Sequence, residues 1–160
     1  MFTMRFAMQS RSSDPAVRSA MYRTTLDMCA WADTRGAIAM VSQHHGVEDG
    51  YLPSTLTLAS AIAARTERLP ISVAALLLAL YEPVKLAEDM AVLDLLSGGR
   101  VSYVIGIGYR QEEFDRFGVD RRTRAGLVEQ RIGQLRALFA GETVDIAGRS
   151  VGLTPLPLTT

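Results

Sequence analysis

Short apolar segments alternate with longer segments of helical periodicity along nearly the whole chain. Strands are expected at residues 4–9, 37–42, 69–80 and 100–108. Helical patterns follow them, over 14–36, after Pro53, over 82–99 and over 123–140. Strict strand–helix alternation predicts an α/β fold with a parallel sheet and right-handed crossovers. The last segment, 143–153, has the pattern of a small hairpin that turns at Ala147–Gly148.

Residues that favour helix ends support two of these helices. Asp14 is placed to cap a helix in which Pro15 takes the first position, where its missing N–H has no cost. Pro83 stands near the start of the third helix, and Gly98–Gly99 closes it. Apolar residues recur at helical spacing in the first helix, at Val17, Met21, Met28 and Trp31.

Two architectures satisfy this alternation: an open doubly wound sheet, and part of a (β/α)8 barrel. Both place the functional site beyond the carboxyl ends of the parallel strands. Residues 43–46, 75–82 and 106–114 all fall at such ends. We expect residues 1–160 to form a single domain in which these stretches meet.

Composition excludes several classes of function. Lys plus Arg and Asp plus Glu both number 17, so the net charge is zero, which argues against nucleic-acid or anionic-membrane binding. The single cysteine, Cys29, leaves no internal disulfide and favours a reducing compartment. We find no signal peptide and no apolar run of the ~20 residues that span a bilayer. A cytoplasmic location is therefore expected.

The two histidines of the chain, His44 and His45, are adjacent and follow the second strand. A hydrogen-bonded structural loop is one interpretation, and metal ligation is another. Adjacent residues of an extended segment point to opposite sides, however, and no second cluster has ligand spacing. We therefore predict no metal site. A catalytic or orienting role for a histidine at a strand end is the better functional interpretation.

Small residues mark the third and fourth strands. Ala74 and Ala75 interrupt a strand of larger side chains, which fits either packing beneath a helix or a thin wall for a flat ring. Gly106 and Gly108 would let a cofactor approach the backbone, or would simply form a tight exit from the strand. They are a weak dinucleotide fingerprint, because the third glycine is missing and no helix opens directly from them.

Arginines near the fourth strand have two interpretations each. Arg110 could contact a phosphate or carboxylate, or pair on the surface with Glu112 or Glu113. A second basic group could form a local basic patch, but a solvated helix entry is the expected interpretation. It consists of Arg121, Arg122 and Arg124.

Three stretches in order resemble the bacterial-luciferase-like flavin-dependent monooxygenases and oxidoreductases. They are "SQHHG" after the second strand, "EPVKLAEDMAVLDLLSGGR" at the third helix, and "GIGYRQEEFDRFGVD" after the fourth strand. The resemblance covers nearly the whole chain. It implies a (β/α)8 barrel that binds reduced flavin, either FMN or F420, at the carboxyl ends of its strands. A full barrel needs ~250 residues, so we expect the N-terminal half: about four βα units plus the hairpin.

The resemblance also implies roles for individual residues. His44 matches the family's active-site histidine, and His45 its less critical neighbour. Ala74–Ala75 matches a bulge, often a non-prolyl cis peptide, that backs the isoalloxazine ring. Gly106 to Arg110, including Gly108, matches the loop beside the flavin and its ribityl chain. Gln43 stands where the family usually has a glutamate, a loss of charge that would lower the basicity of His44.

Three functions are compatible with these features. The first is a flavin-dependent enzyme, or half of one, that takes a small organic substrate, works with a flavin reductase and forms a homo-oligomer. The second is a truncated, non-catalytic half-barrel that dimerises or binds flavin weakly. The third, a metal-dependent barrel hydrolase, has an incomplete ligand set.

Overall fold

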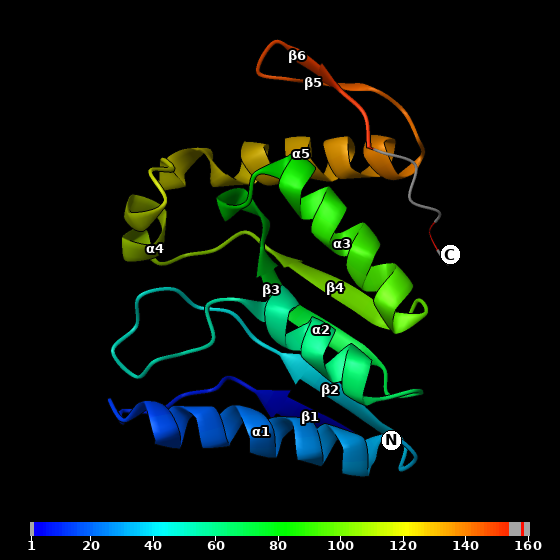
Figure 1. Cartoon of the computed structure of the whole chain (residues 1–160). Helices are drawn as coiled ribbons and strands as arrows, with labels where there is room; N and C mark the ends of the chain where they lie inside the picture. The colour runs from blue at the N-terminus through cyan, green and yellow to red at the C-terminus, as the bar shows by residue number, and fades with distance from the viewer. Residues whose placement is uncertain (1, 154–157, 159–160) are drawn as a thin grey trace.

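Four parallel strands form one sheet, in the order β1-β2-β3-β4 (Figure 1). The computed structural model describes residues 2–153 and 158. The strands are β1 (Phe2–Phe6), β2 (Ala37–Val41), β3 (Ile71–Leu77) and β4 (Val101–Gly106). Their spatial order follows the sequence without a reversal. This is the order of consecutive units in a barrel, whereas a doubly wound sheet reverses at a switch point.

Helices connect the strands as the alternation predicts. They are α1 (Pro15–Ala32), α2 (Thr55–Arg65), α3 (Pro83–Ser97), α4 (Gln111–Arg116) and α5 (Arg124–Phe139), with 3₁₀ turns η1 (Leu78–Leu80) and η2 (Arg121–Thr123). β5 (Val144–Ile146) and β6 (Arg149–Val151) form the predicted hairpin. The hairpin is a separate two-stranded sheet and lies beyond α5 (Figure 1).

The predicted start of the first helix and the predicted end of the third are confirmed, whereas the first helix ends at Ala32 and not at residue 36. The Asp14 carboxylate accepts a hydrogen bond from the backbone N–H of Ala16 at 2.8 Å, with Pro15 as the first helical residue. At the C-terminal end of α3, Gly98 adopts the left-handed conformation with φ 62°. Such a residue ends a helix by satisfying its last carbonyl groups, and glycine does so without a steric penalty.

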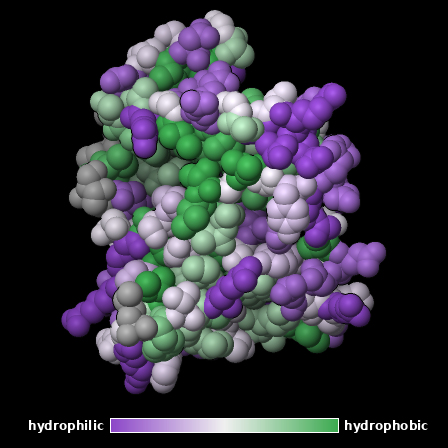
Figure 2. Space-filling model, turned by 180° about the vertical axis from the view of Figure 1, so that it is seen from behind, coloured by the Kyte–Doolittle hydropathy of each residue, from purple (hydrophilic) through white to green (hydrophobic). Residues whose placement is uncertain are grey.

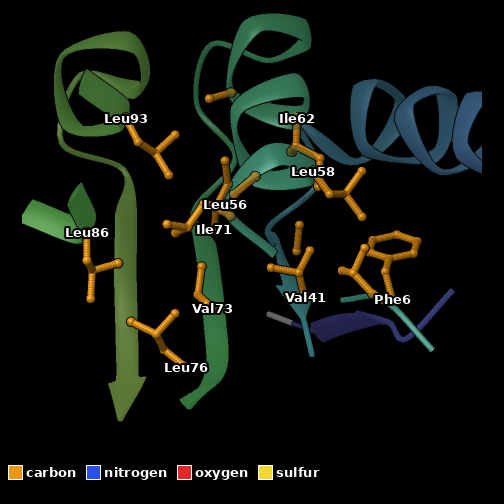
Figure 3. Close-up of a cluster of buried hydrophobic side chains, with 14 of the residues drawn as sticks. Phe6, Val41, Leu56, Leu58, Ile62, Ile71, Val73, Leu76, Leu86 and Leu93 are labelled. Carbon is orange, nitrogen blue, oxygen red and sulfur yellow. The ribbon is translucent and has the colours of Figure 1, made fainter. Parts of the chain in front are cut away.

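The hydrophobic core lies between the sheet and the helices that cover it. Ile62 of α2 and Ile71 and Val73 of β3 belong to this core, and all three are fully buried (Figure 3). Leu86 and Leu93 extend the core under α3, while Phe6 and Val41 extend it towards β1 (Figure 3). The core therefore holds the strands in register and fixes where their carboxyl ends lie.

The main differences from the prediction are two strand boundaries and one additional helix. The first strand covers Phe2–Phe6 rather than 4–9, and α4 was not predicted. The third strand ends at Leu77, because residues Leu78–Leu80 coil into η1. A continuous apolar run does not show where extended backbone gives way to a turn, since both are buried.

Both edges of the parallel sheet lack a neighbouring strand within the described part of the chain. On the β4 side, Val104 and Ile107 are 53% and 50% exposed. Figure 2 views the molecule from behind and shows a group of apolar side chains on that face. No helix among residues 2–153 has the length and apolarity to cross a bilayer.

Candidate functional site

A cavity of about 380 Å³ opens at the carboxyl ends of the parallel strands. We call it the strand-end cavity. Its walls are Arg5, Ser42, Gln43, His44, Tyr51, Ala74, Ala75, Leu77, Gly106, Ile107, Gly108, Tyr109 and Arg124. The predicted residues His44, Ala74, Ala75, Gly106 and Gly108 are among them, so the fold brings together three stretches that are distant in sequence.

A larger cavity of about 670 Å³ lies between β1 and α1. Its walls include Phe6, Val17, Met21 and Thr25, and they hold neither histidine nor glycine. Its only ionisable wall residue is Arg5, which also reaches the strand-end cavity. Because chemistry needs groups that move protons or approach a ligand closely, we place the candidate site in the smaller cavity.

The imidazole ring of His44 contacts a buried carboxylate. Its Nδ1 lies 2.9 Å from Oε1 of Glu113, a residue of α4 whose side chain is 1% exposed. A carboxylate oxygen accepts, so Nδ1 carries a proton in this contact. Nε2 is then the ring nitrogen left to exchange a proton with a molecule in the cavity. The edges of Tyr51 and Tyr109 flank the ring, at centroid distances of 4.7 and 6.0 Å.

His45 has a different partner. Its Nε2 lies 2.5 Å from the amide nitrogen of Gln43, and its backbone N–H donates to Oε1 of Glu113 at 2.8 Å. Burial lowers the pKa of the His45 imidazole, and the charges of His44 and Arg116 lower it further, against the opposing effect of Glu113. His45 is not part of the cavity wall.

The effect of Gln43 on the basicity of His44 stays a prediction, and the structure places the Gln43 amide beside His45. Gln43 replaces a charge next to His45, whereas His44 keeps a carboxylate partner in Glu113. Gln43 and His45, two residues apart, have side chains that meet, whereas the side chain of His44 between them reaches Glu113; Gln43 also lines the strand-end cavity. The side chain of Gln43 is 3% exposed.

The wall formed by β3 and β4 is thin. The Ala74–Ala75 peptide bond is cis, and the register with β4 shifts between Ala74 and Leu76. The bulge and cis bond expected from the family resemblance are both present. A Cβ at Gly106 would lie 2.7 Å from the Cβ of Ala75, a distance that real Cβ atoms do not tolerate. Gly106 and the two alanines thus keep this wall almost free of side chains.

Gly108 positions the carboxylate behind His44. Its φ is +72°, and a Cβ there would lie 2.9 Å from the ring of Phe114. The left-handed backbone turns the chain straight from β4 into α4, which buries Phe114 completely and Glu113 beside it. The glycine predicted to contact a cofactor therefore also explains how Glu113 reaches the histidines.

Two arginines place positive charge on the cavity wall. Arg5 donates from Nε to Oγ of Ser42 at 3.0 Å and from a terminal nitrogen to the hydroxyl of Tyr51 at 2.9 Å. Arg124 is the first residue of α5, and its Nε is buried without a hydrogen-bond partner among the described residues. Arg124 is thus not simply part of a solvated helix entry, unlike Arg122, which pairs with Asp120 at 88% side-chain exposure.

Arg110 does not line the cavity. Neither of its two suggested surface pairs, with Glu112 or with Glu113, occurs among the ion pairs of the described residues. Its Nε is buried and also lacks a partner among those residues. The assignment of Arg110 to cofactor binding stays a prediction. Among residues 2–153, no three His, Cys, Asp or Glu side chains are grouped as metal ligands.

Comparison with known proteins identifies the family. The model for luciferase-like monooxygenases matches residues 3–159. The chain belongs to this family. Among its luciferase-like relatives is the oxygenase component of a flavin-dependent trigonelline monooxygenase from Acinetobacter baylyi, 24% identical over 87% of this chain and 40% of that protein. The alkanal monooxygenase alpha chain of Photorhabdus luminescens is 31% identical over 59% of this chain and 26% of its own length.

A solved structure confirms the fold. The monooxygenase RslO1 from Streptomyces bottropensis superposes with a TM-score of 0.82 at 25% identity, over 99% of this chain and 48% of that one. The chain therefore spans less than half the length of these luciferase-like relatives.

Sequence reasoning missed three residues of the site: Glu113, Arg124 and Arg5. Glu113 was considered only as a surface partner of Arg110. The signal that marks it is its place directly before Phe114, a large apolar residue in an otherwise charged segment. Nothing local in the sequence marks Arg5 or Arg124, because their roles depend on how the strand ends and α5 come together.

Proposed function

We propose that the strand-end cavity binds reduced flavin and that the chain serves as part of an enzyme that oxygenates a small organic substrate. The observation that carries the proposal is one juxtaposition. A wall with no side chain larger than a methyl group, at Ala74, Ala75 and Gly106, faces the same cavity as His44, whose ring is paired with Glu113. Membership of the luciferase-like family and the flavin-dependent relative support this function.

The residues of the cavity fit a flavin. Its volume of about 380 Å³ lies within the ~300–1,000 Å³ typical of ligand pockets. The flat wall at Ala74–Ala75 and Gly106 suits an isoalloxazine ring, which needs close contact over a plane. The unpartnered Nε of Arg124 and the cation of Arg5 suit an anionic group such as a phosphate.

Bound reduced flavin would supply the electrons that activate dioxygen for the reaction. The protein's part is then to handle protons and exclude water. His44 would give or take a proton at Nε2, while Glu113 holds the ring by its Nδ1–H. Tyr51 and Tyr109 flank His44 and reduce the access of water to its ring.

The source of reduced flavin is also part of the proposal. The trigonelline relative is named as an oxygenase component, which supports a separate flavin reductase as partner. The same cavity could accept F420 in place of FMN, because both present a flat three-ring system to the wall. We expect the protein to act as a homo-oligomer in the cytoplasm.

A second function has its own supporting observation. The outer edges of β1 and β4 have no strand neighbour in the described part of the chain, and Val104 and Ile107 are half exposed. A non-catalytic half-barrel that binds flavin weakly, or dimerises through these edges, would have such features.

Anaerobic titration of the chain with reduced FMN and with reduced F420 tests the proposal. We expect saturable binding of one of them, lost in Gly106→Val, whose side chain would occupy the space against Ala75. Gly133→Val on α5, where no atom lies within 4 Å of an added Cβ, is the matched control and should bind normally. Equal binding by all three proteins, or binding by none, would contradict the proposed site.

A further inference from the structure

The two histidines are adjacent in sequence but have partners of different chemistry. Oε1 of Glu113 faces Nδ1 of His44 at 2.9 Å, whereas the amide nitrogen of Gln43 faces Nε2 of His45 at 2.5 Å. A carboxylate accepts hydrogen bonds, while an amide –NH2 can only donate them. The two rings must therefore offer opposite functions: a proton from His44, a lone pair from His45.

We propose that Gln43 is a positioning residue that fixes His45 as the neutral tautomer protonated on Nδ1, so that only His44 exchanges protons in the active site. The catalytic consequence rests on the proposed function. The division of the pair itself rests only on the contacts described here, and it can be tested without flavin.

The orientation of the Gln43 amide is set by its other contacts. Its Oε1 accepts from the hydroxyl of Tyr81 at 3.2 Å and faces the backbone N–H of Leu77 at 3.4 Å. A backbone N–H cannot accept, so a reversed amide would place two donors against each other at Leu77. The –NH2 group must then point towards His45, whose Nε2 has to be unprotonated to receive it.

Protonation of His45 would break this arrangement. A proton on Nε2 would face the –NH2 of Gln43 at hydrogen-bond distance, and the side chain of Gln43 is buried, so two donors would meet there without an acceptor. The charged groups around His45 divide in sign. Glu113 favours its cation, and His44 and Arg116 oppose it. Glu113 is already engaged by the Nδ1 of His44 and the backbone N–H of His45.

A glutamate at position 43 would have the opposite effect. Its carboxylate would accept from Nε2 of His45 and stabilise the imidazolium, giving a pair in which both rings can hold a proton. The glutamine thus separates the roles of the two histidines, which a glutamate would leave more alike.

Long-range ¹H–¹⁵N NMR spectra of the ¹⁵N-labelled chain test this directly, because the protein contains two histidines. His45→Asn assigns the two spin systems. In the wild-type chain we expect His45 to show a protonated Nδ1 and an unprotonated Nε2, with a titration midpoint below that of a free histidine. In Gln43→Glu the midpoint of His45 should rise by about 1–3 pH units.

Gln130→Glu is the control, because it makes the same chemical change at an exposed position of α5. It should leave both histidines unchanged. A His45 protonated on Nε2 in the neutral wild-type chain would overturn the proposal, as would a Gln43→Glu midpoint equal to that of the control. If Gln43→Glu fails to fold, the wild-type tautomer alone decides. Failure of flavin to bind would leave these spectra, and the proposal, unaffected.

Discussion

Oε1 of Glu113 lies 2.9 Å from Nδ1 of His44 and 2.8 Å from the backbone nitrogen of His45. One buried carboxylate oxygen thus holds both the ring of the first histidine and the backbone of the second. The contact joins the segment after β2 to α4, and His45 and Glu113 are 68 residues apart in sequence. The catalytic geometry of the site therefore depends on α4, an element that carries no residue of the cavity wall.

Replacement of Glu113 should affect both the stability of the protein and the function of His44. Glu113→Ala removes the acceptor for two donors and should cost roughly 1–3 kcal/mol for each donor left buried without a partner. Glu113→Gln keeps the shape and should retain the fold while lowering any turnover that depends on His44. Urea denaturation measures the first effect, and steady-state kinetics the second.

The neighbouring Glu112 provides the control for this comparison, because it is exposed on the same helix. Glu112→Gln should change neither stability nor rate. Equal behaviour of Glu112→Gln and Glu113→Gln would show that the buried carboxylate does not position the histidine.

His44 should matter more than His45 for turnover. In any preparation that oxygenates substrate, His44→Ala should lower kcat by roughly 10²-fold or more, the usual range for an acid–base group. Flavin affinity should change little, because the wall at Ala74–Ala75 and Gly106 is untouched. A larger loss of kcat in His45→Ala would reverse the assigned roles.

Arg100 should be among the most important residues for stability. Its guanidinium donates to the carbonyls of Ala63, Thr66, Leu69 and Ser97 and to Oγ1 of Thr66. Its hydrogen bonds therefore link the end of α2 to the segments that lead into β3 and β4. Arg100→Met leaves these acceptors unpaired and should lower the free energy of unfolding by about 3 kcal/mol.

The matched control is Arg136→Met, since Arg136 is exposed on α5. Chemical denaturation of the two variants should separate them clearly. A change below about 0.5 kcal/mol in Arg100→Met, the range of ordinary surface substitutions, would count against this role.

Asp33 should make stability depend on acid pH. Burial acts to raise the pKa of its carboxyl, but the backbone N–H groups of residues 67–69 and the charge of Arg100 outweigh it and hold the pKa below the usual 3.8. A lowered pKa in the folded state gives stability that is present above the unfolded pKa and is lost as pH falls through the folded value.

The difference in unfolding free energy between wild type and Asp33→Asn should accordingly be full at neutral pH and shrink below about pH 4. Denaturation at a series of pH values measures it. A wild-type advantage that persists unchanged in acid would contradict the assignment.

Residues 1–160 by themselves should bind reduced flavin without productive turnover. Two sheet edges have no strand partner among residues 2–153, and Val104 and Ile107 are half exposed, which favours self-association. Flavin in such an open site would meet water, so its electrons should reach oxygen as peroxide. Size-exclusion chromatography should show dimers or larger species, and product analysis only peroxide. A monomer with substrate-dependent turnover would exclude this expectation.

Much of the fold could be predicted from the sequence because local signals agreed with it. Asp14, Pro15 and Gly98 mark helix ends through backbone chemistry that acts over a few residues. The buried face of α1 was less predictable: Thr25, Cys29 and Ala32 are buried, whereas the apolar Met28 and Trp31 are exposed. Side-chain size, and not hydrophobicity alone, decides what fits against the sheet.

The site residues at strand ends could be predicted, whereas those that reach the site through tertiary contacts could not. His44, Ala74, Ala75 and Gly106 follow from topology, because parallel strands end at one edge. Glu113 could not be found in this way, since the turn at Gly108 that carries it to His44 is set by packing on Phe114. The local signal for Glu113 is the apolar Phe114 that follows it in a charged segment, and this signal does not indicate the contact with His44.

The most direct test of the proposed site is to locate reduced flavin on the chain by NMR. Backbone amide shifts of the ¹⁵N-labelled protein, followed during anaerobic titration with reduced FMN or F420, would show which cavity is occupied. The flavin site proposed here predicts saturable shifts at His44, Ala75, Gly106 and Arg124, with little change at Val17 and Met21. Shifts gathered instead on the larger cavity between β1 and α1, or no saturable shifts with either flavin, would contradict it.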